Sequence, residues 1–399
     1  MEKRSSRKEI LPVFAAVVIL TSCLYAVMTA VQPTLSGNPV LKDFGSVISG
    51  CMTGDPISRI YWYFADITEG NFVAALSAAV PMILVGFLAA WLETKGSKWA
   101  GSGVDGNGRI FSRMAVTGLL SPILAQLVFG GLFQIYGWIP TFAGFVVVQI
   151  LITKYGVKLP QLVTTLILGT VITFPLCLLF MLKITMPLGL PTFLSVAYGF
   201  VLAVPICCEI CNRLPWMKAS AQNSAPAEES GTVTPYVPTP TGFFLNRVFG
   251  DVGELVVWGS SIATMASYLG GTIGWLINPL HPAYAAGNWP TIMCGQILTA
   301  ALAVFLWYPK YQRDGWYFTF TAVIFASAVF VTYSNSLLVV IPTILVAAII
   351  VPPFMHWLMK ITKYQGRYPA IVCVQTAVGI TCTLWCFFLM HVYLPALGL

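Results

Sequence analysis

Long apolar runs restrict the fold of this chain more than any other feature. Of its 399 residues, 57% are hydrophobic and only 9% are charged. A bilayer core about 30 Å thick requires roughly 20 apolar residues per crossing helix. Such runs predict helices because every backbone polar group must be hydrogen-bonded within its own segment in lipid. The composition therefore predicts an all-α polytopic membrane protein, with the plasma or inner membrane as its location.

The sequence supplies about eleven such runs, within a range of roughly ten to twelve. The shortest run, 139–153, is the weakest candidate for a full crossing, and an inverted repeat would require such a short span to be re-entrant. The predicted spans are 9–31, 70–92, 111–134, 139–153, 160–182, 190–211, 252–277, 289–307, 316–334, 337–358 and 369–392.

The basic residues indicate how these spans are oriented. With a cytoplasmic amino terminus, all but three of the 21 Lys and Arg residues fall on the cytoplasmic side, the exceptions being Lys42, Arg59 and Lys183. This bias follows the positive-inside rule. We therefore predict a cytoplasmic amino terminus and an external carboxyl terminus. Because the basic residues follow sidedness and form no patch, we expect no nucleic-acid partner.

A linker divides the predicted membrane regions. Residues 218–241 are rich in Ser, Pro, Thr and Ala and cannot bury a core. We predict a flexible cytoplasmic linker here. The other predicted regions are two amino-terminal helices with an external segment at 1–93, a first membrane repeat at 94–217, a second membrane repeat at 242–360 and a carboxyl-terminal helix at 361–399.

The repeat prediction depends on short identities that recur at a nearly constant separation along the chain. These are Met114-Ala115 with Met265-Ala266, Pro140-Thr141 with Pro290-Thr291, and Pro191-Thr192 with Pro342-Thr343. They match the third to sixth predicted spans with the seventh to tenth. Since an even number of spans separates equivalents, the two four-helix repeats would have the same orientation. The first, second and eleventh spans lie outside the repeat.

The segment 32–69 is too polar to span, and we expect it to lie outside the membrane. Its Tyr61-Trp62-Tyr63 cluster is typical of aromatic side chains at the headgroup level. A role as a lid over an external cavity is the alternative.

Ionisable residues are scarce inside the predicted spans. Glu254, one turn into the seventh span, has no evident partner in the sequence. An intramembrane carboxylate is a functional candidate, so Glu254 is predicted as a coupling-ion or proton site, with helix capping as the alternative. The i,i+4 spacing predicts ion pairs between Arg247 and Asp251 and between Glu209 and Arg213.

The sequence contains no H-E-x-x-H motif or nucleophile constellation. Cys208-Glu209-Ile210-Cys211 has metal-ligand spacing but no nearby histidine, so apolar packing explains it better. We therefore expect no catalytic residue, no metal site, no cofactor and no enzymatic activity.

Two proline-led helix starts define the predicted substrate site. Pro140-Thr141 and Pro290-Thr291 would each direct a helix amino end, which attracts anions, toward the external side. An ordinary external turn with an aromatic belt is the alternative interpretation. The predicted substrate-binding residues are Gln134, Tyr136, Trp138, Thr141, Asn278, His281, Tyr284, Asn288, Trp289, Thr291 and Asn335.

These features predict a secondary transporter, a permease that binds a small polar or anionic solute between two repeats and works by alternating access. Coupling to Na⁺ or H⁺ is left open. The alternatives are the membrane subunit of a multicomponent transport system and an integral membrane enzyme acting on a lipid-linked substrate. The expected partners are the solute and the lipid bilayer, and a homo-oligomer is compatible with the sequence.

Overall fold

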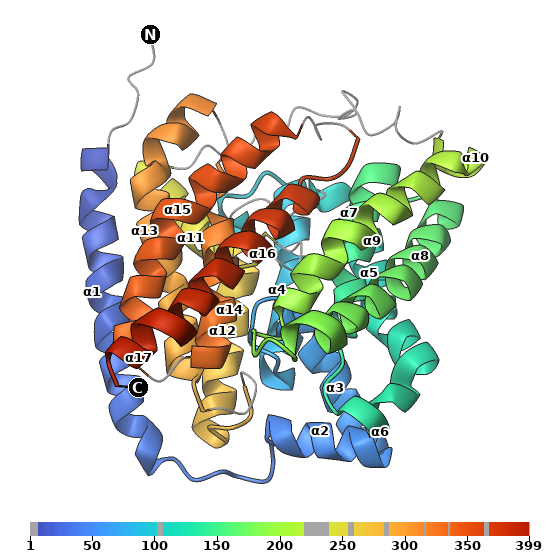
Figure 1. Ribbon diagram of the computed structural model, residues 1–399. Coiled ribbons are helices and arrows are strands. Elements are labelled where there is room, and N and C mark those ends of the chain that lie inside the picture. Colours follow the sequence, from blue (N-terminus) through green and yellow to red (C-terminus); the bar gives the residue numbers. More distant parts are fainter. Residues whose placement is uncertain are drawn as a thin grey trace.

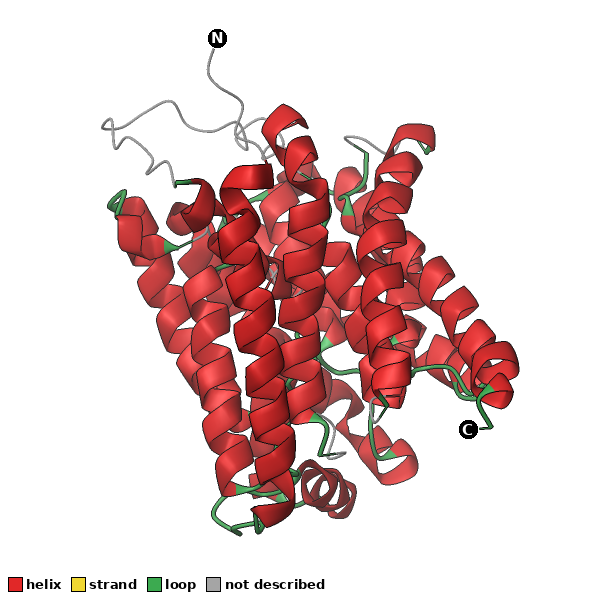
Figure 2. Cartoon of the chain, turned by 90° about the vertical axis from the view of Figure 1, so that its left-hand side faces the viewer, coloured by secondary structure: helices red, strands yellow, loops and turns green. Residues whose placement is uncertain are grey.

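The chain folds into a bundle of helices in which α1 begins at one end and α17 lies at the other (Figure 1). The computed structural model describes residues 7–101, 107–218, 239–253, 259–282, 287–314, 317–333, 336–362 and 367–398. Every regular element within these ranges is a helix. Figure 2 shows the long helices packed side by side, with the loops gathered at the two ends. The predicted all-α fold class is confirmed.

Eight helices in the described ranges are long and apolar enough to cross a membrane. The shortest candidate span, Leu76–Thr94, has 19 residues and at 1.5 Å per residue reaches about 28 Å. These eight helices support a membrane-embedded protein. They are α1 (Arg7–Val31), α4 (Leu76–Thr94), α5 (Asn107–Phe129), α8 (Leu159–Phe180), α9 (Leu194–Arg213), α13 (Trp289–Asp314), α15 (Leu337–Ile361) and α16 (Ile371–Phe388).

Three further predicted spans form shorter helices. The spans predicted at 139–153 and 316–334 become α7 (Ala143–Tyr155) and α14 (Phe320–Tyr333), with 13 and 14 residues. At about 20 Å they are too short to cross a full bilayer core. Nearly all their side chains are buried, as expected for helices that are apolar on every side. The third, predicted at 252–277, becomes α12 (Ser261–Ile277).

Two helices end inside the protein just before another begins. The chain of α3 (Pro56–Glu69) turns through residues 70–75 into α4, and α11 (Pro240–Gly253) precedes α12. At the first break Phe72 and Ala74 have left-handed backbone conformations, with φ of 58° and 45°. Residues 65–75 are all buried. The first break is therefore an internal turn and not a surface loop.

This result corrects the placement of the segment 32–69. Its last part, α3, enters the bundle, and the Trp62 side chain is only 1% exposed instead of lying at a membrane surface. The polar residues of α3 lower its hydropathy, but they find partners inside the protein. Hydropathy alone cannot distinguish such a helix from an external loop.

The remaining elements are short and lie mainly between the long helices. They are η1 (Gln32–Thr34), α2 (Phe44–Thr53), η2 (Lys98–Ala100), η3 (Gly130–Leu132), α6 (Phe133–Tyr136), η4 (Met181–Thr185), α10 (Pro215–Lys218), η6 (Leu389–Tyr393) and α17 (Leu394–Ala396).

Two long contacts join the amino-terminal and carboxyl-terminal halves. Helix α4 packs antiparallel to α12, since Ser77 near the start of α4 lies against Gly274 near the end of α12. A Cβ atom on Gly270 would lie 2.1 Å from the Ser77 carbonyl oxygen. These glycines therefore allow the two backbones to approach closely.

The second contact is between α9 and α16, which are also antiparallel. The Tyr198 hydroxyl near the start of α9 hydrogen-bonds to Thr383 near the end of α16. Near the other end, Glu209 accepts hydrogen bonds from Arg367 at 2.9 Å and Tyr368 at 2.8 Å. Arg367, and not the predicted Arg213, thus forms the ion pair with Glu209.

The helix lengths do not support the repeat predicted from the Met-Ala and Pro-Thr identities. Those identities equate α7, which has 13 residues, with α13, which has 26. The same-orientation repeat therefore has no structural support.

The contact between α4 and α12 generates a first prediction. Gly270→Ala places a methyl group against the backbone of Ser77, and such overpacking costs about 1–3 kcal/mol. Gly131→Ala is the matched control because its Cβ would meet nothing within 4 Å. Thermal unfolding in detergent should show a lower Tm for Gly270→Ala than for Gly131→Ala. Equal Tm values would contradict the close packing of α4 on α12.

Candidate functional site

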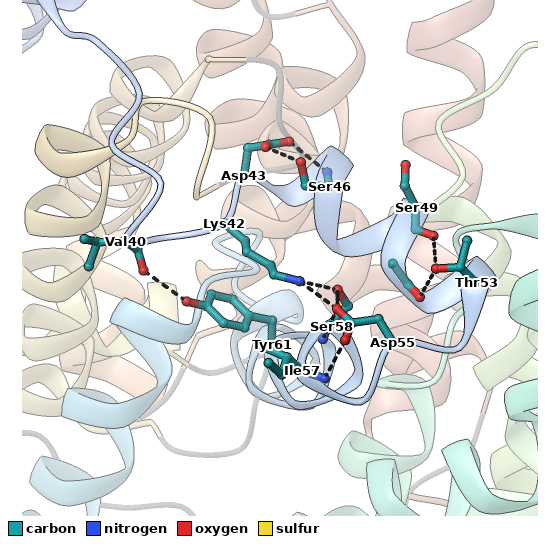
Figure 3. A network of polar contacts seen from close by, with 11 residues as sticks. Val40, Lys42, Asp43, Ser46, Ser49, Thr53, Asp55, Ile57, Ser58 and Tyr61 are labelled. Carbon is teal, nitrogen blue, oxygen red and sulfur yellow. Dashed lines mark hydrogen bonds and ion pairs between the residues drawn. The ribbon is translucent and has the colours of Figure 1, made fainter.

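A polar network fixes the position of α3 at the end of α1 (Figure 3). Lys42 donates hydrogen bonds to Asp55 at 2.7 Å and to Ser58 at 2.9 Å. Asp55 also caps the first turn of α3, as Asp43 caps α2. The Lys42 ammonium and the Ser58 hydroxyl hold the pKa of Asp55 well below its usual range. The start of α3 is thereby anchored, and its other end points into the bundle.

The buried end of α3 carries two carboxyl groups, those of Asp66 and Glu69, which are 1% and 0% exposed. The Thr141 hydroxyl donates to Asp66 at 2.9 Å and accepts a hydrogen bond from the Trp62 indole at 2.7 Å. The Trp138 indole donates to Glu69 at 2.7 Å. These five residues form a group that we call the Asp66 cluster.

A similar group lies at the end of α11. Arg247 forms an ion pair with the fully buried Asp251, which confirms that predicted pair. The Thr319 hydroxyl donates to Asp251 at 2.5 Å and hydrogen-bonds to the Tyr311 hydroxyl. The Arg247 guanidinium lies over the Tyr311 ring, 5.6 Å from its centre. We call these four residues the Asp251 cluster.

The two clusters arise from matching sequences. Asp66-Ile67-Thr68-Glu69 recurs in the second half as Asp251-Val252-Gly253-Glu254. Gly137-Trp138-Ile139-Pro140-Thr141-Phe142 recurs as Gly315-Trp316-Tyr317-Phe318-Thr319-Phe320. We call these the aspartate match and the threonine match. In both clusters an aspartate near the end of a helix accepts a hydrogen bond from a threonine that immediately precedes a short buried helix, α7 or α14.

The same two matches relate the aromatic neighbours. Extended without gaps, the aspartate match equates Trp62 with Arg247, and the threonine match equates Phe133 with Tyr311. Trp62 packs edge-on against Phe133, with ring centres 4.8 Å apart, and Arg247 lies over Tyr311. Contact with the aromatic ring recurs in both clusters. The neutral indole of Trp62 in the Asp66 cluster takes the position of the Arg247 guanidinium in the Asp251 cluster.

A further correspondence lies deeper between the helices. The threonine match, extended without gaps, equates Gly118 with Gln296 and Gln149 with Ser327. Gln296 on α13 donates to Ser327 on α14 at 2.9 Å. In the first half the glutamine comes from the short helix, and the Gln149 side chain fills the space beside Gly118. In both halves a glutamine side chain lies between the two equivalent helices. It comes from the short helix α7 in the first half and from the long helix α13 in the second.

The Gln296 amide also connects the first break to α12. It donates to the Asn71 carbonyl oxygen at 2.9 Å and accepts from the Tyr268 hydroxyl at 2.7 Å. In contrast, neither amide atom of the buried Gln149 has a hydrogen-bond partner in the described structure. The two glutamines therefore differ in how well their polar atoms are satisfied.

Part of the predicted substrate site lines a cavity of about 610 Å³ at the end of α1. Asn278, Asn288 and Thr291 contribute to its wall, opposite Tyr25 and Gln32. None of the residues 134–141, all of which the structure describes, lines it. The two proline-led segments therefore do not share this cavity.

The other predicted residues have separate positions. Trp138 and Thr141 belong to the Asp66 cluster, whereas Gln134 and Tyr136 are exposed on α6. The Trp289 side chain is fully buried and donates to Thr272 at 3.3 Å. Tyr284, Asn335 and the predicted coupling residue Glu254 lie outside the described residues.

His281 and Asn278 tie the segment between α1 and α2 to the end of α12. The Asn278 amide donates to the Leu41 carbonyl at 2.8 Å. His281 Nδ1 lies 2.7 Å from the Lys42 carbonyl, and Nε2 lies 3.4 Å from the Ser77 N–H. The ring therefore donates through Nδ1 and accepts through Nε2, which is the pattern of a neutral imidazole. Burial lowers the pKa of His281, so we assign it a structural role.

Sequence reasoning missed Asp66, Glu69, Asp251 and Thr319 as site residues. It placed Asp66 in an external segment and treated Asp251 only as an ion-pair partner. The recurrence of Asp-x-x-Glu at Asp66 and at Asp251 is a signal that would have found the carboxylates. Within the described ranges, no group of three or more His, Cys, Asp or Glu side chains is arranged to hold a metal ion.

The fold and the two clusters define a membrane-embedded helical protein with buried carboxylates at the ends of interrupted helices. No protein-family model, curated protein or solved structure matches the chain.

The buried imidazole generates a second prediction. Because the pKa of His281 is lower in the folded protein than its ordinary value of about 6.5, stability is fully present above that value and is lost as pH falls. We expect His281→Asn to be less stable at pH 8 and to lose less stability between roughly pH 8 and pH 5.5. His391→Asn, an exposed control, should retain the wild-type slope. Parallel Tm profiles for wild type and His281→Asn would rule out a buried neutral ring.

Proposed function

We propose that this protein is a secondary transporter that moves a small polar or anionic solute by alternating access. The observation that best supports this proposal is the pair of matched hydrogen bonds, between Asp66 and Thr141 and between Asp251 and Thr319. Each contact joins the end of one helix to the start of a short buried helix. Interrupted helices at corresponding positions of two repeats are the arrangement that transporters use around a substrate.

Helix order supports a repeat of opposite orientation. The aspartate and threonine matches together equate six elements, in order, on each side of the linker. The series α3, α4, α5, α7, α8 and α9 corresponds to α11, α12, α13, α14, α15 and α16. The short helices α7 and α14 then match in length, with 13 and 14 residues.

The direction of the chain supports inversion. Helix α13 is antiparallel to α1, because Arg7 contacts Leu306 and Gln32 contacts Gly287. Helix α5 runs the other way, since it leads through η3 into α6, at the end of the bundle where α1 finishes (Figure 1). The equivalents α4 and α12 are antiparallel neighbours, as are α9 and α16. Such pairing is expected for repeats related by a two-fold axis in the membrane plane.

The clusters lie toward opposite ends of the bundle. The Asp66 cluster adjoins α2 and α6, at the end where α1 finishes (Figure 1). Helix α11 of the Asp251 cluster packs Phe244 against Phe14, near the start of α1. With the predicted cytoplasmic amino terminus, one cluster would close the external side and the other the cytoplasmic side.

The strength of these contacts suits a gate. A hydrogen bond to a charged group contributes about 1.5–3 kcal/mol. A solute that binds one conformational state more tightly than another can offset the free energy of such a hydrogen bond and so shift the population between the two states. Each aspartate would release its threonine when its side opens.

The cavity at the end of α1 supports the proposed solute class. Its volume of about 610 Å³ is within the range of small-molecule sites, roughly 300–1,000 Å³. The described residues of its wall offer amide and hydroxyl groups and include no charged side chain. The first turn of α13 contributes Pro290 and Thr291 to the wall, so the positive end of this helix borders the cavity. These groups favour a polar or anionic solute.

Flux through liposomes tests the function directly. Purified protein reconstituted into liposomes should take up one class among labelled carboxylates, sugars and amino acids. Asp251→Asn should lower the rate by about tenfold or more, because the ion pair and the threonine contact both weaken. Asp43→Asn, which preserves a helix cap, is the matched control. Absence of flux across the whole panel would favour a membrane enzyme or a subunit of a larger system.

The paired gates generate a separate prediction. Thr141→Val and Thr319→Val each remove one hydrogen bond to a carboxylate and should bias the protein toward opposite open states. In intact cells, labelling of Thr291→Cys by an impermeant maleimide should rise with Thr141→Val and fall with Thr319→Val. Thr94→Val, at the exposed end of α4, should leave labelling unchanged. A shift of the same sign in both variants would argue against two gates.

A further inference from the structure

The two clusters differ in charge at matched positions. In the Asp251 cluster, the Arg247 guanidinium is a buried counter-charge for the carboxylate. The equivalent residue in the Asp66 cluster is Trp62, whose indole N–H reaches Thr141 and is neutral. The Asp66 cluster also contains a second carboxyl group, that of Glu69. The Asp66 cluster therefore contains two carboxyl groups, and its residue at the position of Arg247 is neutral.

In the described structure the Thr141 hydroxyl that donates to Asp66 is neutral, and the Asp66 carboxyl group is buried on the same helix as that of Glu69. Asp66 and Glu69 lie three residues apart on α3, about one helical turn, and both are buried. Two carboxyl groups can share a hydrogen bond only if a proton lies between them. If both are ionised, desolvation and mutual repulsion oppose burial unless a cation is present. Either state requires added positive charge.

Two cations near the cluster in the described part of the chain, Lys42 and Arg59, have other partners. Lys42 pairs with Asp55 at the start of α3. Arg59 donates to the Gly130 carbonyl and lies over the Phe133 ring. Among the described residues, Cys51 on α2 and Tyr63 and Glu69 on α3 also interact with Asp66. None of these three carries a positive charge.

Two buried oxygens are available for a ligand. Within the described structure, Asp66 Oδ2 and Asn71 Oδ1 have no hydrogen-bond partner, and both residues are 1% exposed. Asn71 begins the internal turn two residues after Glu69. Oxygen atoms of carboxylates, amides and unwound backbone are the groups that bind Na⁺ or carry a proton at interrupted helices. The unused acceptors therefore have the chemistry of a cation site.

We propose that the Asp66 cluster binds one cation, a proton or Na⁺, through Asp66 and Glu69, and that Arg247 takes the place of this cation in the Asp251 cluster. In the proposed transporter this site would hold the coupling ion, and that role rests on the proposed function. Cation binding itself can be measured without measuring flux. The proposed site lies on α3 and differs from Glu254, the residue that the sequence predicted for this role, which lies outside the described residues.

Tryptophan fluorescence is a direct probe, because Trp62 and Trp138 both belong to the cluster. Purified full-length protein would be titrated with NaCl against N-methyl-D-glucamine chloride at constant ionic strength, and separately with pH in the absence of Na⁺. For a Na⁺ site we expect a saturable change in emission and a higher Tm with Na⁺. For a proton site we expect the emission to titrate with pH alone.

Variants test whether the cation-dependent change in emission or Tm comes from the Asp66 cluster. Asp66→Asn and Glu69→Gln should weaken the cation response at least about tenfold, while Asp43→Asn should retain it. Trp62→Arg reproduces the Arg247 arrangement but removes one reporter, so it is followed by Tm. The cation-dependent change in Tm should be abolished while the protein stays folded, because the guanidinium then occupies the cation position. A response that persists in Asp66→Asn, or wild-type protein that responds to neither Na⁺ nor pH, overturns the proposal.

The binding and transport results can fail independently. A cation response without flux for any solute would leave the site in place and remove the transporter function. Flux without a cation response would leave transport in place, as facilitated diffusion, and remove the site. Loss of the response in Trp62→Arg with flux retained would show that the arginine supplies the charge that the cation otherwise provides.

Discussion

The hydrogen bond between a buried aspartate and a threonine is the interaction on which the interior of this protein depends. A helix that ends inside an apolar bundle leaves polar groups that water cannot reach. Here each of the two interrupted helices carries an aspartate near its end, and a threonine at the start of a neighbouring helix meets it. The contact gives one carboxylate oxygen a hydrogen bond and at the same time sets the depth of a short helix. Polar satisfaction and helix position are therefore coupled at both sites.

Sequence analysis predicted the helical membrane class because long apolar runs have few alternatives. It failed at α3, where Asp66, Glu69 and Asn71 make the segment look solvent-exposed although all three are buried. Hydropathy averages over residues and cannot recognise polar groups that pair internally. The Arg247 and Asp251 pair was predictable because both residues lie on one helix, whereas Glu209 pairs with Arg367, which is distant in the sequence.

The repeat illustrates a second limit of sequence reasoning. The same-orientation repeat rested on short identities such as Met-Ala and Pro-Thr, which recur readily by composition at helix starts. The aspartate and threonine matches include residues whose chemistry is used in contacts, and the contacts recur with them. Of the predicted substrate residues, the structure gathers Asn278, Asn288 and Thr291 at one cavity and Trp138 and Thr141 at the Asp66 cluster. Their distribution follows tertiary packing, which a single sequence does not encode locally.

The glycines between α4 and α12 have a mechanical consequence. Gly270 lies against the Ser77 backbone and Gly274 against the Ser77 side chain, so only small side chains separate the two helices there. Close-packed surfaces of this kind resist sliding. Helices α4 and α12 are therefore expected to behave as one rigid pair shared by both halves of the chain. In the proposed transport cycle, relative motion would then be carried by α3 and α11, the helices that precede α4 and α12 in the chain.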